Sequence, residues 1–207
     1  FCLSDDGQLR PLTYQIYWSR VYALAMFLRE LGVRLGDRIA IVMPASTDWE
    51  IAEKAVLSIG GVVVGIEPHA SDVDLTYIVD ATKPTVAVAR AGDVTERLKR
   101  LHLHAFTILT AADGAYAATD GDTTLCQWHL NAACPDDAWT AGFPASGDVA
   151  TIIFTSGTTG VPKGIPYTHG QVLLACASLL ESYAGIDKTD NTICWLPLAN
   201  LFQRMMN

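Results

Sequence analysis

The sequence has few charged residues and no basic run. Asp, Glu, Lys and Arg make up 17% of the 207 residues, and the formal net charge is −8. Hydrophobic residues make up 50%, so the chain can bury a core as one large or two small domains, which excludes a disordered tail. Without a Lys/Arg cluster the chain offers no face to nucleic-acid phosphates, although one lysine, a helix N-terminus and a metal ion suffice for a nucleotide.

Cysteine motifs, a signal peptide and long apolar runs are also absent. The five cysteines are scattered and form no CxxC pair, so they suggest neither a disulfide framework nor a zinc site and predict a reducing, cytoplasmic location. The start has no Met, basic segment or apolar segment, so we expect a piece of a longer chain rather than a secretory leader. The apolar stretch at residues 55–66 is shorter than the ~20 residues that span a bilayer, which leaves only peripheral membrane contact open. The oligomeric state is not set by the sequence.

Apolar periodicity predicts helices and strands in alternation. Helices are expected at residues 14–31, 47–59, 71–81, 93–101 and 169–183. Strands are expected at residues 38–43, 62–66, 85–89, 105–109, 149–154 and 192–196. The alternation predicts an α/β fold, with mostly parallel sheets and helices on both faces. Thr47 and Glu50 are expected to form the capping box that opens the second helix.

Residues 110–147 interrupt this alternation. The segment is rich in Ala, Asp, Gly and Thr, which predicts a variable surface connection with one short element near residues 125–130. We expect this connection to close a first α/β subdomain at residues 1–147. Residues 148–207 are then expected to begin a second α/β subdomain, which carries the candidate site.

One segment carries the chemistry, Thr155-Ser156-Gly157-Thr158-Thr159-Gly160-Val161-Pro162-Lys163-Gly164. Glycines let backbone N–H groups approach an anion, hydroxyls donate to phosphate oxygens or bind Mg²⁺, and Lys163 adds a positive charge. The pattern differs from a Walker A loop, because Pro162 precedes the lysine and Gly164 follows it. The segment therefore predicts a phosphate-binding loop of another type.

This ten-residue string resembles the phosphate-binding signature of the adenylate-forming, or AMP-binding, superfamily. Acyl-CoA synthetases, peptide-synthetase adenylation domains and luciferases belong to it. The resemblance covers nearly the whole chain, including residues 12–14, 31–33, 36–41, 60–65 and 167–169, and is weakest over residues 110–147. Residues 195–204 most resemble the long-chain fatty acyl-CoA synthetases. Relatives usually have histidine where this chain has Asn200, near the substrate pocket.

The resemblance implies part of the large N-terminal domain of an ATP-dependent ligase of fatty acid and lipid metabolism. Such an enzyme joins a carboxylic acid to AMP and then to the thiol of coenzyme A. The resemblance thereby implies ATP and Mg²⁺ as cofactors and coenzyme A as a co-substrate. The implied nucleotide-binding residues are Thr155, Ser156, Gly157, Thr158, Thr159, Gly160 and Lys163. Thr155 is also implied as a magnesium contact, and Asn200 as a substrate contact.

The resemblance further implies that much of the catalytic apparatus lies beyond Asn207. This missing part includes the adenine-binding segment, an acidic magnesium ligand, the aspartate that binds ribose and the C-terminal domain with the catalytic lysine. We therefore expect no catalytic residue in this chain and no activity from it alone. Two alternatives stay open, a peptide-synthetase-type adenylation domain and a non-catalytic nucleotide-binding module.

Overall fold

The computed structural model describes residues 2–3, 9–90, 92–101, 107–112, 115–120, 123–129, 144–155, 161–183 and 198–199. The main strands are β3 (Arg38–Val42), β4 (Val62–Ile66), β5 (Val86–Arg90), β6 (Thr107–Ala112), β7 (Ala115–Asp120), β8 (Thr123–His129), β9 (Val149–Thr155) and β10 (Lys163–Thr168). The helices are α1 (Tyr14–Glu30), α2 (Thr47–Ser58), α3 (Asp72–Thr82), α4 (Asp93–Arg100) and α5 (His169–Ser182). The short strands β1 (Cys2–Leu3) and β2 (Leu9–Arg10) form a separate antiparallel pair.

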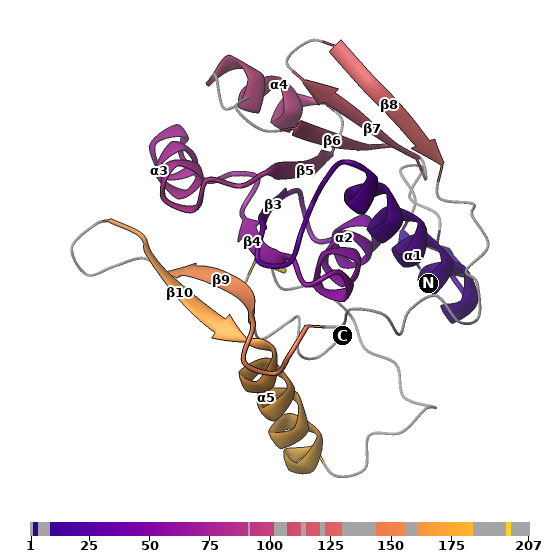
Figure 1. The fold of residues 1–207 in the computed structure, drawn as a ribbon, viewed down its shortest axis with the longest axis vertical. Coiled ribbons are helices and arrows are strands. Elements are labelled where there is room, and N and C mark those ends of the chain that lie inside the picture. The colour runs from indigo at the N-terminus through magenta and orange to yellow at the C-terminus, as the bar shows by residue number, and fades with distance from the viewer. Residues whose placement is uncertain are drawn as a thin grey trace.

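The main strands form one sheet in the order β10-β9-β4-β3-β5-β6-β7-β8 (Figure 1). The neighbouring pairs β9–β4, β4–β3, β3–β5 and β5–β6 are parallel, whereas β10, β7 and β8 run antiparallel to their neighbours. The chain crosses over β3 between β4 and β5, so helices are delivered to both faces of the sheet. The predicted α/β fold with a mostly parallel sheet is confirmed.

Two apolar layers enclose the centre of the sheet. Side chains of β3 alternate between them, with Ile39 and Ile41 packed in the layer that contains α1 and α2. Ala40 and Val42 pack in the layer that contains α3 and α4. A strand buried on both faces needs apolar residues at successive positions, which explains the continuous apolar runs of β3 and β4.

Hydroxyl side chains cap the amino ends of α1, α2, α3 and α5. The Ser46 Oγ accepts a hydrogen bond from the Trp49 N–H at 3.3 Å, and the Ser71 Oγ accepts one from the Asp74 N–H at 3.0 Å. The capping box predicted at Thr47 and Glu50 is therefore wrong, because Ser46 is the N-cap of α2 and the third helical residue, Trp49, has no carboxylate or amide to complete a box. Serine and threonine both favour this position, so two adjacent hydroxyl residues leave the cap ambiguous in the sequence.

The segment after β6 contains more strand than the sequence predicts. β8 corresponds to the one short element expected near residues 125–130, but β7 was not expected. Three of the six residues of β7 are alanine and one is aspartate, both of which are depleted in strands, and its ladder to β6 pairs Leu109 with Ala118. A paired strand edge can thus impose a conformation that the local composition does not indicate.

The division at residue 147 stays a prediction. Strands from both sides of that position share one sheet through the β4–β9 pair, so any boundary there crosses a continuous sheet. The strand predicted at residues 192–196 lies outside the described residues. Within the described ranges, no helix is both long and apolar enough to cross a membrane.

A substitution at the end of α3 tests the backbone account. Lys83 has φ 45° and ψ 63°, a left-handed conformation in which a Cβ costs roughly 1–2 kcal/mol. Lys83→Gly should raise the free energy of unfolding by about 0.5–1 kcal/mol, after the greater freedom of glycine in the unfolded chain is subtracted. Urea unfolding measures this change. Lys83→Ala keeps the Cβ and should give no gain, and a loss of stability in Lys83→Gly would contradict the account.

Candidate phosphate-binding site

The two ends of the signature segment meet across a hairpin. Thr155 is the last residue of β9 and Lys163 is the first of β10, and the antiparallel ladder pairs them directly. Paired residues in such a ladder have Cα atoms about 4.5–5.5 Å apart. Both residues are exposed. A hydroxyl and an ammonium group therefore stand side by side where the chain enters and leaves the signature segment.

The hairpin opens at the carboxyl edge of the parallel sheet. β9 pairs in parallel with β4, with Val64 opposite Ile152. Glu67 and Thr155 each lie three residues farther along these neighbouring strands. In open α/β sheets, ligands bind outside the carboxyl ends of the strands. The position of the hairpin thus suits a phosphate-binding site.

The structure revises the extent of the loop. Lys163 and Gly164 were expected in a loop that runs from Thr155, but both belong to β10. Residues 156–160, which carry the other predicted phosphate contacts, lie outside the described residues, and so does Asn200. The assignment of individual phosphate-binding and substrate residues therefore stays a prediction.

Packing against a neighbouring side chain explains why residue 164 is a glycine. It pairs with Phe154 across the hairpin, and an ideal Cβ at position 164 would lie 2.9 Å from the Phe154 Cζ. A side chain at position 164 would require this ring to move, whereas glycine leaves it in place. The last glycine of the signature thus supports the hairpin, a role that its place in a Gly-rich string does not reveal.

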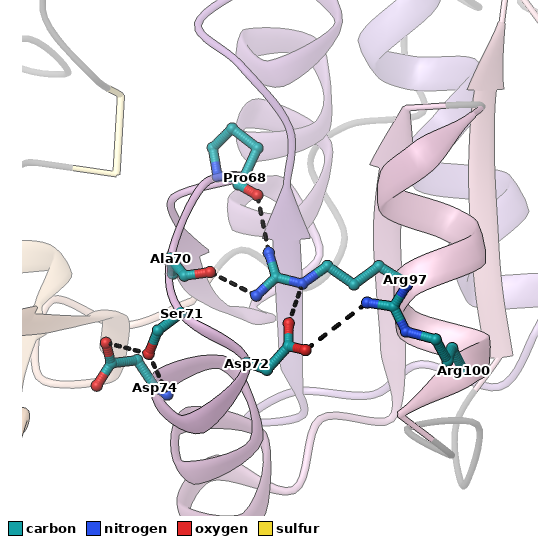
Figure 2. Close-up of polar contacts among 7 residues, drawn as sticks. All are labelled: Pro68, Ala70, Ser71, Asp72, Asp74, Arg97 and Arg100. Atoms are coloured by element: carbon teal, nitrogen blue, oxygen red, sulfur yellow. Dashed lines mark hydrogen bonds and ion pairs between the residues drawn. The ribbon is translucent and has the colours of Figure 1, made fainter.

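An arginine fixes the turn that follows β4 (Figure 2). The Arg97 side chain, on α4, donates from Nη1 to the Pro68 carbonyl oxygen at 3.1 Å and from Nη2 to the Ala70 carbonyl oxygen. Its Nε donates to the Asp72 Oδ1 at 2.6 Å, and Arg100 lies 3.6 Å from the other oxygen of that carboxylate. Carbonyl groups that could otherwise point to water are held by one rigid guanidinium group. The turn at the carboxyl end of β4 is therefore tied to α4.

This turn begins with Glu67, which the sequence did not single out. The Glu67 Oε1 is buried and has no hydrogen-bond partner within the described structure. Burial raises the pKa of Glu67, and nearby His69 opposes the shift. A carboxylate that loses water without gaining a donor destabilises the fold. An acidic residue directly after a buried strand was the one signal that could have drawn attention to it.

A hollow lies at the opposite edge of the sheet. It has a volume of about 270 Å³ and is lined mostly by apolar residues, with Arg38 and Asp148 among them. Arg38 begins β3 and Asp148 directly precedes β9, so this hollow is at the amino ends of the parallel strands. It does not coincide with the predicted phosphate-binding hairpin.

The family follows from the signature, the hairpin and the comparison with known proteins. The model of the family described as AMP-binding enzyme matches residues 2–207. The chain belongs to the AMP-binding enzyme family. An acetyl-coenzyme A synthetase of Streptomyces coelicolor is 33% identical over 192 residues, 84% of this chain and 28% of that protein. Long chain acyl-CoA synthetase 8 of Arabidopsis thaliana is 27% identical over 210 residues, 95% of this chain and 29% of that protein.

The fold is shared with solved structures. ATP-bound MatB from Rhodopseudomonas palustris superposes with a TM-score of 0.74 at 21% identity, over 97% of this chain and 38% of that chain. This chain spans less than half the length of each of these three proteins.

Within the described residues of this AMP-binding enzyme chain, no three His, Cys, Asp or Glu side chains gather as a metal site.

The Glu67 carboxyl gives a pH-dependent prediction. Because its pKa is raised in the folded protein, stability should fall as the pH rises from the ordinary glutamate pKa, about 4.3, through the folded-state value. Glu67→Gln removes the ionisation, so its melting temperature should exceed that of the wild type at pH 7. The difference should shrink as the pH is lowered to 4.

Thermal unfolding between pH 4 and pH 8 measures this difference. Glu96→Gln is the matched control, because the Glu96 side chain is 73% exposed on α4 and should show no such pH-dependent gain. A difference between Glu67→Gln and wild type that did not change with pH would show that ionisation of Glu67 is not the cause.

Proposed function

We propose that the whole protein uses ATP to activate a carboxylic acid, namely a fatty acid, and transfers the acyl group to coenzyme A. The observation that carries the proposal is the direct pairing of Thr155 with Lys163 at the mouth of a hairpin on the sheet's carboxyl edge. The family match and the acyl-CoA and acetyl-CoA synthetases among the relatives support it.

In the proposed reaction, the carboxylate oxygen attacks the α-phosphorus of ATP, and pyrophosphate leaves as the acyl-adenylate forms. The thiol of coenzyme A then displaces AMP to give the thioester. The protein's task is to hold the polyphosphate and to offset its negative charge while the reacting groups are brought into line. Lys163 supplies the charge at the β- and γ-phosphates, and Thr155 with residues 156–160 supplies hydroxyl and backbone donors.

Mg²⁺ fits this arrangement only together with the nucleotide. Thr155 offers one hydroxyl ligand, and Mg²⁺ commonly takes one or two protein ligands and completes its shell with phosphates and water. When bound, the ion would neutralise charge on the polyphosphate. We assign the Thr155 Oγ1 as a contact for it and propose a cytoplasmic enzyme whose ligands are small molecules, with only peripheral membrane contact left open.

Two other functions share the hairpin. A peptide-synthetase-type domain would activate amino acids, and a binding module would hold ATP without turnover. ATP–pyrophosphate exchange by the whole protein separates the three, with fatty acids, acetate and amino acids as alternative substrates. Exchange that depends on a fatty acid supports the proposal. Exchange that depends on amino acids alone contradicts it, and so does the absence of exchange with every acid.

Loss of the lysine should impair adenylation. Lys163→Ala in the whole protein removes one charge-assisted contact, which is worth about 1.5–3 kcal/mol, or roughly 10- to 150-fold in rate. The measurement is kcat/KM for ATP in pyrophosphate exchange. Lys99→Ala on α4 is the control and should leave the exchange unchanged. Normal exchange by a folded Lys163→Ala variant would sink the assignment of Lys163.

The 207-residue chain on its own should show exchange at background with every acid. Its hairpin would hold the β- and γ-phosphates, but the α-phosphorus would lack a fixed position, and a misplacement of ~1 Å can cost 10²-fold. Pyrophosphate exchange by the purified chain, beside the whole protein as a positive control, measures this. Acid-dependent exchange above background would show that groups within these residues complete the site.

A further inference from the structure

The hollow at the amino edge of the sheet has the composition of a small-molecule site. Its volume is about 270 Å³, and most of the residues that line it are apolar. An apolar cavity of roughly 150 Å³ is large enough to take up benzene, so this hollow has room for a ligand with more atoms. Small-molecule sites in proteins are mostly apolar, with a few polar groups that orient the ligand.

The apolar walls of the hollow come from three neighbouring strands and from the turn before β3. Val62 begins β4, and Ile152 of β9 is paired with Pro166 of β10, so these last two side chains lie on the same face of the sheet. Leu35 forms a further wall although it is 61% exposed, and it lies over Gly60, where an added Cβ would collide with the Leu35 Cδ1. An apolar ligand in the hollow would remove such surface from water, which favours binding.

The guanidinium group of Arg38, which also lines the hollow, is already engaged within the protein. Its Nε donates to the Thr82 carbonyl oxygen at 2.9 Å, and its Nη2 donates to the Lys83 carbonyl oxygen at 3.2 Å. Its Nη1 donates to the Gly36 carbonyl oxygen at 3.4 Å. Two of these carbonyl groups lie at the end of α3, where the helix dipole places partial negative charge. The positive charge of Arg38 is therefore directed to the end of α3, and each of its nitrogens has an acceptor.

Asp148 supplies a negative charge that the protein leaves available to a ligand. Its Oδ2 accepts a hydrogen bond from the Ala145 N–H at 2.7 Å, and within the described ranges its side chain forms no other hydrogen bond and no ion pair. Burial lowers the pKa of nearby His169, against the opposing effect of Asp148. The imidazole is therefore neutral at pH 7 and does not offset the charge of the carboxylate. The Asp148 Oδ1 can accept a hydrogen bond from a cationic group in the hollow.

We propose that the hollow is a binding site for a small apolar molecule that carries one ammonium group. The apolar body lies between the turn before β3 and the strands β4, β9 and β10, and the ammonium group donates to the Asp148 carboxylate. The apolar contact supplies buried area, and the charge-assisted hydrogen bond orients the ligand. The site is at the far end of β9 and β10 from the mouth of the hairpin, so it is separate from the predicted phosphate site and does not depend on the proposed function.

The experiment titrates the whole protein at pH 7 with phenethylammonium chloride and, in parallel, with phenethyl alcohol, and isothermal titration calorimetry measures the binding. The two molecules have nearly the same shape, but only the first is charged. The ammonium should bind at one site and about tenfold more tightly than the alcohol, because a hydrogen bond between charged groups is stronger than one with a neutral donor. Equal affinities for the two molecules, or no saturable binding of the ammonium, would overturn the proposal.

Two variants test whether this binding takes place in the hollow. Asp148→Asn keeps an acceptor for the Ala145 N–H but removes the charge, so it should weaken binding of the ammonium about tenfold and leave binding of the alcohol unchanged. Leu35→Ala removes part of an apolar wall and should weaken both molecules by a similar factor, about fourfold or more. Because Leu35 is exposed, this variant keeps the test valid if Asp148→Asn does not fold.

Asp93→Asn is the matched control for the loss of one negative charge. Asp93 is exposed at the start of α4, directly after the carboxyl end of β5, so this variant should bind both molecules as the wild type does. Melting temperatures show which variants are folded. An unchanged affinity for the ammonium in folded Asp148→Asn or Leu35→Ala, or an equal loss of affinity in Asp93→Asn, overturns the proposal.

Discussion

The pairing of β9 with β4 is the constraint on which the rest of the site depends. The two strands are far apart in sequence, and they are locked by a buried hydrogen bond of 2.8 Å from the Thr151 Oγ1 to the Val63 carbonyl oxygen. Because Thr151 is fully buried, this bond forms away from competing water. It sets the register that brings the end of β9, and with it the hairpin, to the carboxyl edge of the sheet. Without that register, Thr155 and Lys163 would still face each other but would not face the end of β4.

Two features at this edge weaken the fold locally. Glu67 places a carboxyl oxygen out of water without a donor in the described structure, and Gly65 leaves a strand position without a side chain. Around them the structure is well tied, by the guanidinium group of Arg97 on one side and the buried Trp49 on the other. A local loss of stability within a rigid frame is typical of functional sites, where the residue present is not the one that would stabilise the fold most.

The central sheet and its helices could be predicted from the sequence because each element carries its own signal. β4 is a continuous apolar run, α1 has its apolar stripe, and α3 has its serine cap. β7 could not be predicted in this way, since its pairing with β6 and not its composition makes it a strand. The cap of α2 was misplaced by one residue for a related reason, because two neighbouring hydroxyl residues satisfy the same local rule.

The site was predictable only in part. The Gly- and Thr-rich string indicated phosphate binding, but its local composition did not show that Lys163 pairs with Thr155 in a hairpin. Glu67, the Arg97 contacts and the close approach of Ala199 to Gly65 depend on segments that are distant in sequence. No periodicity or motif within a short window encodes such contacts, so they emerge only from the folded chain.

The most direct test of the account is a crystal structure of the whole protein with a non-hydrolysable ATP analogue. The account predicts the polyphosphate at the mouth of the β9–β10 hairpin, with the Lys163 Nζ within hydrogen-bond distance of a β- or γ-phosphate oxygen. A nucleotide bound elsewhere, for example in the hollow beside Arg38 and Asp148 at the amino edge, with Lys163 left in solvent, would contradict it.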